Sequence, residues 1–428
     1  MSNVQNLFSQ PSFPAPLPGQ SFFGAGNIQI YSSSGTFIVP PGVTRIRVRV
    51  WGAGGSGGCT CETALGRVTS GGGGGGHGMK VIDTTPGTSY TVTVGAGGAQ
   101  VTGAARNNGN AGGTSSFDTA VTCTGGGGGA ATGGAAPITV SGGTGGTSTG
   151  GDVNYSGGAG GSATVLTTAV SFSRSVSSGG GASGSIFGNG FRGGNISLDT
   201  AAAASCSHAS GGGGVGGRGG DITSTTNSAG QGGGGGGTYS NAADMTTSNY
   251  GNAGGGFTLP FTNFENNQST AARVGSAAYL NTFSSVPADL FNVFGTNASQ
   301  PQLYGALGTG YNNAQKVGSY PVGSVRRFPG DILISNAINA QDAEYASIPI
   351  DGTGGFGSVG GGTNITSTEN KYAGAFGGGG GTSDTNNSAL KGFHGSIGGG
   401  GGGTSGRNTP DASTVSGRGG NGMVVVEW

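Results

Sequence analysis

The clearest periodic pattern in the chain is an alternation of apolar and basic residues between positions 43 and 51. The alternating residues are Ile46, Val48 and Val50 on one parity and Arg45, Arg47 and Arg49 on the other. A period of two is the side-chain period of a β-strand, so the pattern predicts a strand with one buried face and one cationic face. We expect the arginines to cover an exposed strand face and to discourage edge pairing rather than to bind phosphate.

Apolar and β-branched runs predict further strands on both sides of this segment. Pro40, Pro41 and Gly42 mark a turn between the strand at 43–51 and a preceding strand. The other predicted strands lie at 28–30, 35–39, 78–82, 89–94, 113–117, 121–123 and 423–428. Because strands lie toward both ends of the chain, the sequence predicts a small β-sheet base that is closed by the N- and C-terminal strands.

Glycine dominates the segments between these strands, with 104 glycines among 428 residues. Glycine brings no side chain to bury and loses the most backbone freedom on folding, so a side-chain core cannot be the main source of stability. Unbroken runs at 71–76, 125–129, 232–237 and 398–403 break the triplet rule of collagen. The glycine runs can then be in one of two states. They are either disordered linkers or extended left-handed polyglycine helices whose amides pair with neighbouring helices. We expect the second, and predict a mostly β fold whose glycine runs are ordered, polyglycine II-like hairpin excursions from the base.

The composition changes near residue 257 and changes back near residue 350. This stretch has few glycines, and it contains two predicted short helices at 271–283 and 287–294 and a predicted strand at 331–334. We interpret it as an inserted compact subdomain, with a long ordered loop over the glycine layers as the alternative. The predicted division is an extended docking segment (1–27), a glycine-rich domain with the β base (28–256), the low-glycine insertion (257–350), and a glycine-rich continuation with the closing strand (351–428).

Prolines and apolar side chains are interspersed along residues 1–27. Proline fixes φ and removes a donor, so this segment predicts an irregular strap that lies on another protein. The predicted carrier-docking side chains are Leu7, Phe8, Phe13, Leu17, Phe22 and Phe23. The alternative is a disordered terminus.

Charge and targeting signals narrow the classes of partner. The chain carries 17 basic and 17 acidic side chains, which removes the usual electrostatic reason to propose nucleic acid or an acidic membrane surface. The first residues lack the features of a signal peptide, and no stretch approaches the roughly 20 apolar residues of a membrane span. A protein that is made in the cytoplasm and acts outside the cell suits a particle released by lysis.

Four segments of the chain form an ordered set of motifs, namely residues 35–55, with the sequence GTFIVPPGVTRIRVRVWGAGG, then 86–98, 112–117 and 419–428. In this order they resemble the glycine-rich domains of bacteriophage tail fibres and related prophage receptor-binding proteins. The resemblance implies a virion location, and for some members a role in host recognition through loops displayed on a polyglycine-helix scaffold. The insertion at 257–350 has no counterpart in the family pattern.

Motifs that would indicate catalysis are weak in this chain. Residues 52–57 satisfy G-x-G-x-x-G after a strand, but another glycine run follows instead of the helix that a dinucleotide site needs. Acidic residues at Asp152, Asp199, Asp221 and Asp331 are scattered among turn residues, and we interpret them as solvated. We therefore predict no catalytic residue, no cofactor and no enzymatic activity, while a depolymerase site assembled from distant segments stays open as an alternative.

Thiols and imidazoles are zinc-type ligands, and the chain has four cysteines and three histidines. The candidate ligands are Cys59, Cys61, Cys123, Cys206, His77 and His208. Their spacing lacks a zinc knuckle on both sides, so we predict no metal site. We interpret them as buried thiols and loop histidines, with an opportunistic disulfide as the alternative.

The favoured functional hypothesis is a virion fibre or tail-tip protein that binds a host glycan or outer-membrane protein. Loop tyrosines suit such contacts, and the predicted contacts are Tyr239, Tyr250, Tyr304 and Tyr311. The alternatives are a purely structural virion component and, less compatible with the sequence, an ice-binding or cell-wall protein. Either a homotrimer or attachment to a trimeric carrier is expected.

Overall fold

The structure is a computed structural model of the chain. It describes residues 27–63, 66–166, 174–199, 206–224, 230–232, 235–236, 241, 244, 362–363, 373, 376–384, 389–407 and 410–428. All regular structure within these residues is β, in agreement with the predicted fold class. The predicted insertion at 257–350 with its two helices and its strand, the six docking side chains, and the four tyrosines lie outside the described residues.

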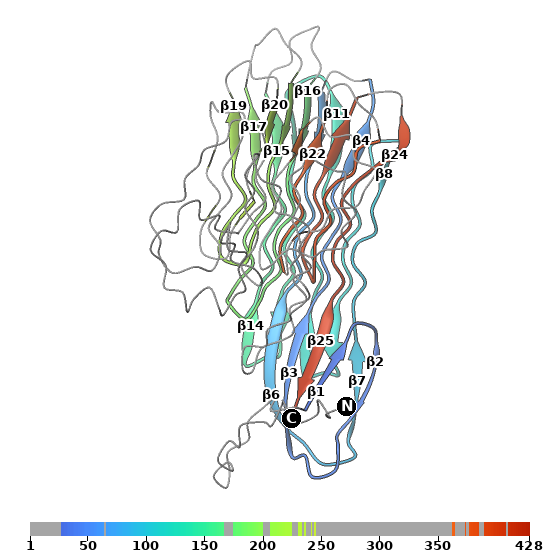
Figure 1. Ribbon diagram of the computed structural model, residues 1–428, viewed down its shortest axis with the longest axis vertical. Helices are drawn as coiled ribbons and strands as arrows, with labels where there is room; N and C mark the ends of the chain where they lie inside the picture. The colour runs from blue at the N-terminus through green and yellow to red at the C-terminus, as the bar shows by residue number, and fades with distance from the viewer. Residues whose placement is uncertain are drawn as a thin grey trace, which may run out of the picture.

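Two five-stranded sheets form the base of the molecule, at the bottom of Figure 1. The first has the order β1 (Ile28–Tyr31), β25 (Met423–Glu427), β3 (Arg45–Trp51), β6 (His77–Asp83) and β14 (Val153–Tyr155). The second has the order β13 (Ser148–Thr149), β10 (Val121–Cys123), β9 (Ser115–Phe117), β7 (Ser89–Thr93) and β2 (Gly35–Ile38). Strand β25 pairs with both β1 and β3, so strands from both ends of the chain close the base as predicted.

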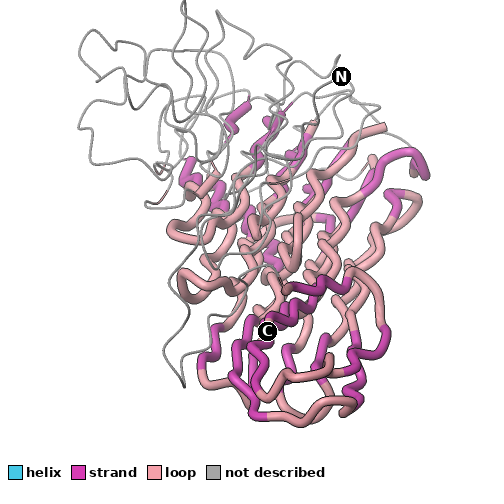
Figure 2. Tube along the Cα trace, turned by 60° about the horizontal axis from the view of Figure 1, so that its bottom comes forward, coloured by secondary structure: helices cyan, strands magenta, loops and turns pink. Residues whose placement is uncertain are grey.

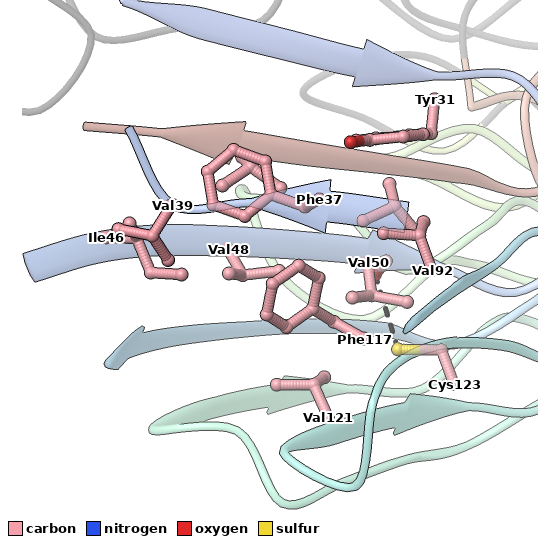
Figure 3. Close-up of a cluster of buried hydrophobic side chains, with 12 residues drawn as sticks. Tyr31, Phe37, Val39, Ile46, Val48, Val50, Val92, Phe117, Val121 and Cys123 are labelled. Atoms are coloured by element: carbon pink, nitrogen blue, oxygen red, sulfur yellow. Dashed lines mark hydrogen bonds between the residues drawn. The ribbon is translucent and has the colours of Figure 1, made fainter. Parts of the chain in front are cut away.

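An apolar core fills the space between the two sheets (Figure 3). The apolar parity of β3 faces this core, and Val48 is fully buried between Phe37 and Phe117 of the opposite sheet. The ring of Phe37 lies 6.2 Å from that of Phe117 and 5.4 Å from that of Trp428. Cross-sheet contacts of this kind are the usual way in which a β-sandwich is stabilised.

The prediction of an exposed cationic face on β3 is wrong for part of its length. Arg45 is exposed and lies 3.2 Å from Asp83, as expected for a surface residue. Arg49, however, is only 3% exposed, and its Nε lies 3.5 Å from Oε2 of Glu427. Arg47 also pairs with Glu427. The register of β25 against β3 places this buried carboxylate beside both arginines, a pairing that the alternation alone could not reveal.

Extended glycine-rich segments, called glycine rods below, run from the base to the far end of the molecule (Figure 1). They lie side by side without strand pairing, as the stacked pink tubes of Figure 2 show. The described rods include residues 52–58, 70–76, 95–99, 109–113, 124–130, 141–147, 156–162, 178–184, 190–195, 210–214, 377–381, 392–396, 398–403 and 416–422.

Short strands at the opposite end of the rods form the distal sheets, at the top of Figure 1. One sheet has the order β11 (Ala131–Gly134), β5 (Gly66–Thr69), β16 (Arg174–Ser177), β18 (Cys206–Ala209) and β20 (Gly230–Gly232). A second comprises β12 (Ile138–Val140), β15 (Ala163–Val165), β17 (Ile196–Leu198) and β19 (Ile222–Ser224). A third comprises β21 (Gly362–Thr363), β22 (Thr382–Ser383), β23 (Thr404–Gly406) and β4 (Cys59–Cys61), and β24 (Asp411–Val415) pairs with β8 (Thr102–Gly103).

Many neighbours in these distal sheets are parallel, because strands that enter the distal end pair with one another and strands that leave it do the same. Strands β5, β16 and β18 each lead into a rod, whereas β15 and β17 each follow one. Strands β5, β16, β18 and β20 pair in parallel, and so do β15, β17 and β19. Val68, Val176 and Leu198 belong to a second apolar core between the first two distal sheets. The sequence analysis expected hairpin excursions and did not predict these sheets.

Candidate functional site: the rod lattice and the distal end

Rod 70–76 shows how the glycine rods are held together. Its backbone N–H groups donate to three different neighbouring rods in a cycle of three residues. The donor and acceptor pairs are Gly72 to Gly401 (2.8 Å), Gly73 to Gly127 (2.8 Å), Gly74 to Gly158 (2.9 Å), Gly75 to Gly398 (2.7 Å) and Gly76 to Thr124 (3.1 Å). Rod 398–403 therefore accepts from residues three apart, Gly72 and Gly75, and rod 124–130 accepts from Gly73 and Gly76.

Carbonyl groups of the same rod accept from three further rods with the same period. The donor and acceptor pairs are Gly55 to Gly73 (2.9 Å), Gly52 to Gly76 (2.9 Å), Gly143 to Gly71 (2.9 Å), Gly146 to Gly74 (2.8 Å), Gly181 to Gly72 (2.9 Å) and Gly184 to Gly75 (2.9 Å). Six neighbours and a period of three residues are what an extended helix with three residues per turn produces. This confirms the predicted polyglycine II-like order of the excursions.

The sequence of the rods follows from how closely they approach. A Cβ atom placed on Gly73 would lie under 3.0 Å from the carbonyl oxygen of Thr144, and one on Gly72 would meet that of Gly55 in the same way. Real Cβ atoms do not come this close to a backbone oxygen. Rod 398–403 is surrounded similarly, since Gly400 and Gly401 donate to Gly181 and Gly55. Glycine is therefore a steric requirement at these positions of rods 70–76 and 398–403.

Rods at the surface of the lattice expose amides, and asparagine or aspartate side chains bind several of them. Asn195 Oδ1 accepts the Ser162 N–H at 2.9 Å, Asp221 Oδ1 accepts the Asn195 N–H at 2.7 Å, and Asn421 Oδ1 accepts the Gly97 N–H at 2.9 Å. Each of these three acceptors ends an Arg-Gly-Gly-Asn/Asp sequence, at 192–195, 218–221 and 418–421. This repeat was not among the predicted features, although it is visible in the sequence as a recurring tetrapeptide.

Arginines of two of these tetrapeptides form a charge ladder along the same side. The Arg192 guanidinium binds both carboxylate oxygens of Asp221 at 2.7 and 2.8 Å, and Arg218 binds both oxygens of Asp244 at 2.6 Å. Arg218 also lies 3.2 Å from Asp221. The hydrogen bond from Arg218 lowers the pKa of Asp244. Asp221 is thus an ion-pair partner and rod cap, and its interpretation as a solvated turn residue is wrong.

The other acidic residues of the sequence analysis lie apart from one another. Asp152 sits in the turn before β14, and its Oδ2 accepts the Val81 N–H at 2.9 Å. Asp199 is exposed after β17, and Asp331 lies outside the described residues.

A buried polar layer joins two of the distal sheets. Arg67 is fully buried, and its Nε and Nη2 donate to Ser175 Oγ at 2.9 and 2.7 Å. Ser175 Oγ in turn donates to the Asp384 carbonyl at 2.8 Å, and Ser177 Oγ donates to Ser405 Oγ at 2.8 Å. Burial lowers the pKa of Arg67 to about 10. Because burying such groups is costly unless they are hydrogen-bonded, this network fixes how the sheets meet.

The four cysteines are free thiols and all are buried. Burial raises the pKa of Cys123 and of Cys206 to about 11, so neither is an activated nucleophile. Within the part of the chain that the structure describes, no group of three His, Cys, Asp or Glu side chains could hold a metal ion.

The interpretation of His77 and His208 as loop residues is wrong, because they lie on β6 and β18 and are buried. The His77 ring stacks on Trp51 at 4.2 Å, and its Nδ1–H donates to the Val50 carbonyl at 3.0 Å. Phe376 extends the stack at 5.5 Å from Trp51. These aromatic rings lie where the base meets the rods. Burial lowers the pKa of His77 to about 3 and that of His208 to about 4.

Comparison with known proteins supports the glycine-rich assignment. Residues 32–272, more than half of the chain, match the model of a family described as a glycine-rich domain. A search of curated proteins gave no match. Among the described residues, no helix is both long enough and apolar enough to cross a membrane.

Proposed function

The chain belongs to the glycine-rich domain family, and on that premise we propose that it is a non-enzymatic attachment protein of a bacteriophage virion. In this proposal the base faces the particle and the distal sheets face the host. The resemblance of residues 35–55 and 419–428 to tail-fibre domains supports the virion location.

One observation carries the proposal, namely that a hydrogen-bonded lattice separates the base from the distal sheets. The period-three bonding of rods such as 70–76 fixes both ends relative to each other without a side-chain core. A rigid spacer places its far end at a constant distance and angle from whatever holds the base. Presentation of the distal connections to a receptor is a use that needs such a spacer.

The proposed receptor is a neutral glycan or an outer-membrane protein, because the chain has no net charge to select a charged ligand. Turns at the distal end offer the contacts, for example residues 135–137 between β11 and β12, and exposed Leu166 after β15. The predicted contacts Tyr239, Tyr250, Tyr304 and Tyr311 and the predicted carrier-docking segment 1–27 remain part of this proposal.

Binding of the purified, fluorescently labelled chain to host cells tests the proposal. We expect saturable binding that blocks infection, and loss of binding when residues 135–137 are replaced by a Gly-Ser sequence of equal length. The matched control replaces residues 85–87, the turn between β6 and β7 at the base, and should bind like the parent chain. Stable particles together with a chain that neither binds cells nor blocks infection would instead favour a purely structural virion component. Release of reducing sugar from host polysaccharide would point to a depolymerase.

A further inference from the structure

The two lateral edges of the base differ in how they are protected. One edge is formed by β13 and β14, and the other by β1 and β2. Edge strands present unpaired N–H and C=O groups, which proteins normally seal with charges, short strands or side-chain caps. An edge that lacks these protections is available for pairing with another strand.

The edge at β13 and β14 is sealed. Its strands have two and three residues, and the charged residue Asp152 directly precedes β14. Beyond the end of β14, Asp152 Oδ2 accepts the outward Val81 N–H at 2.9 Å, and Lys80 Nζ donates to the Gly150 carbonyl at 2.9 Å. Asn154 Nδ2 donates to the Gly151 carbonyl at 2.7 Å.

Within the residues that the structure describes, the edge at β1 lacks these features. Strand β1 has the sequence Ile-Gln-Ile-Tyr, with no charge, proline or glycine. Trp428 N donates to the Asn27 carbonyl at 3.1 Å, and hydrogen-bonded positions alternate along an antiparallel ladder. The amides that bond to β25 are therefore those of Gln29 and Tyr31, and those of Ile28 and Ile30 point away from the sheet.

Exposed apolar side chains lie on the same side of the base. Among the large hydrophobic side chains that the structure describes, Ile30 is 38% exposed and Ile38 of β2 is 63% exposed. Strand β2 is the less available of the two strands, because the Tyr31 hydroxyl already donates to the Thr36 carbonyl at 3.0 Å. The outward-pointing amides of β1 thus lie beside the exposed apolar side chains of Ile30 and Ile38.

We propose that β1 is the attachment edge of the base, and that an uncharged, extended strand of the carrier protein pairs with the amides of Ile28 and Ile30. This inference rests on the proposed function. The carrier is favoured over a second copy of this chain for a geometric reason. Two β1 strands related by a two-fold axis would run antiparallel, so the two distal ends would point in opposite directions. A carrier strand leaves the distal end free, and the predicted docking segment 1–27 leads directly into β1. Strand addition of this kind obtains affinity from main-chain hydrogen bonds.

The test uses purified particles and the full-length chain. Ile30→Pro removes the outward N–H without removing a bond to β25, and edge strands tolerate proline. We expect particles to incorporate this variant about tenfold less than the parent chain. The control Ile30→Val keeps the N–H and should be incorporated normally. In the parent chain, amide exchange of residues 28–30 should be slower in particles than in the free protein.

Binding of the purified Ile30→Pro variant to host cells separates the two proposals. Unchanged cell binding with lost incorporation supports the edge proposal, whereas failure of the parent chain to bind cells contradicts attachment and leaves the incorporation result intact. Equal incorporation of Ile30→Pro and Ile30→Val, or equal exchange in free and particle-bound chain, would overturn the edge proposal. The edge proposal would also be overturned if the purified parent chain formed a dimer and Ile30→Pro abolished that dimer. The β1 edge would then bind a second copy of the chain.

Discussion

The base and the rod lattice belong to one chain, but side chains stabilise the base and backbone groups stabilise the lattice. In the base, side chains such as Val48 and Phe117 are fully buried against one another, and apolar burial is the main stabilising term. In the lattice, rod 70–76 contributes almost no side chain and is held by backbone hydrogen bonds of 2.7–3.1 Å to its neighbours. The stability of the base should therefore be sensitive to the removal of side-chain atoms, and the stability of the lattice to their addition.

Enlarging an interior rod should have the largest effect. Gly73→Ala places a Cβ against the Thr144 carbonyl, and neither backbone can move without breaking other bonds of the lattice. We expect the free energy of unfolding to fall by about 4 kcal/mol or more, measured by urea denaturation. The control Gly87→Ala adds the same methyl group at a turn with open space and φ of 82°, and should cost about 1–2 kcal/mol. Equal costs would contradict a steric role for glycine in the rods.

Side-chain truncation should destabilise the base more than the rod lattice, the reverse of what enlarging a side chain does. Phe117→Ala leaves a cavity in the core of the base and should lower the free energy of unfolding by about 3–5 kcal/mol. Ala53→Gly removes a buried methyl group from rod 52–58 and should cost only about 1 kcal/mol. Urea denaturation of both variants checks the contrast, which would be lost if Ala53→Gly were as harmful as Phe117→Ala.

Mild acid should weaken both regions, because buried histidines lie in each. Burial lowers the pKa of His77 in the base and of His394 in a rod to about 3, from an ordinary value of 6.5. The unfolded chain takes up protons at these rings below pH 6.5, whereas the folded chain leaves them neutral. The free energy of unfolding therefore falls as the pH falls from 8 to 5, by about 2 kcal/mol for each histidine at pH 5.

Urea midpoints at pH 8 and pH 5 measure this loss. His77→Phe keeps a ring against Trp51 and should remove one histidine's share of the pH dependence. His394 Nδ1 accepts the Arg418 N–H at 2.9 Å, so its protonation also breaks a bond between rods. An unchanged pH dependence in His77→Phe would show that this ring is already charged or exposed in the folded chain.

Opening one surface cap should have the smallest effect. Asn421→Ala removes the acceptor of the Gly97 N–H, which water can replace at the surface. The expected cost is about 0.5–1 kcal/mol, with faster amide exchange at Gly97 as the local measurement. Asn421→Asp keeps an oxygen at the same position and should exchange like the parent chain. Protection of Gly97 in Asn421→Ala would contradict the capping role.

The base and the rods could be predicted from the sequence because each follows a short-range rule. Alternation at 46–50 identified β3, and the strand at 423–428 was expected to close the base. The unbroken glycine runs predict extended helices with three residues per turn, and the hydrogen bonds of rod 70–76 confirm this prediction.

The distal sheets could not be predicted because their strands carry little local signal. Strands such as β4 and β18, with the sequences Cys-Thr-Cys and Cys-Ser-His-Ala, have no apolar alternation. Their burial comes from neighbours far away in sequence, as when Ser177 meets Ser405. The burial of Arg49 depends in the same way on the position of Glu427 in the adjacent strand. These features depend on which strands pair and in what register. Strands that are far apart in the sequence give no local pattern from which that pairing can be predicted.

The three-residue cycle of the rods has a consequence for how such a gene can diverge. Inserting one codon within residues 70–76 would turn every later amide toward the wrong neighbour, whereas a codon inserted between β11 and β12 would change no phase. Indels should therefore be tolerated at the far connections in any number, but within rods only in threes and in several rods together. Selection can thus alter the outermost contacts repeatedly while the length of the scaffold stays constant.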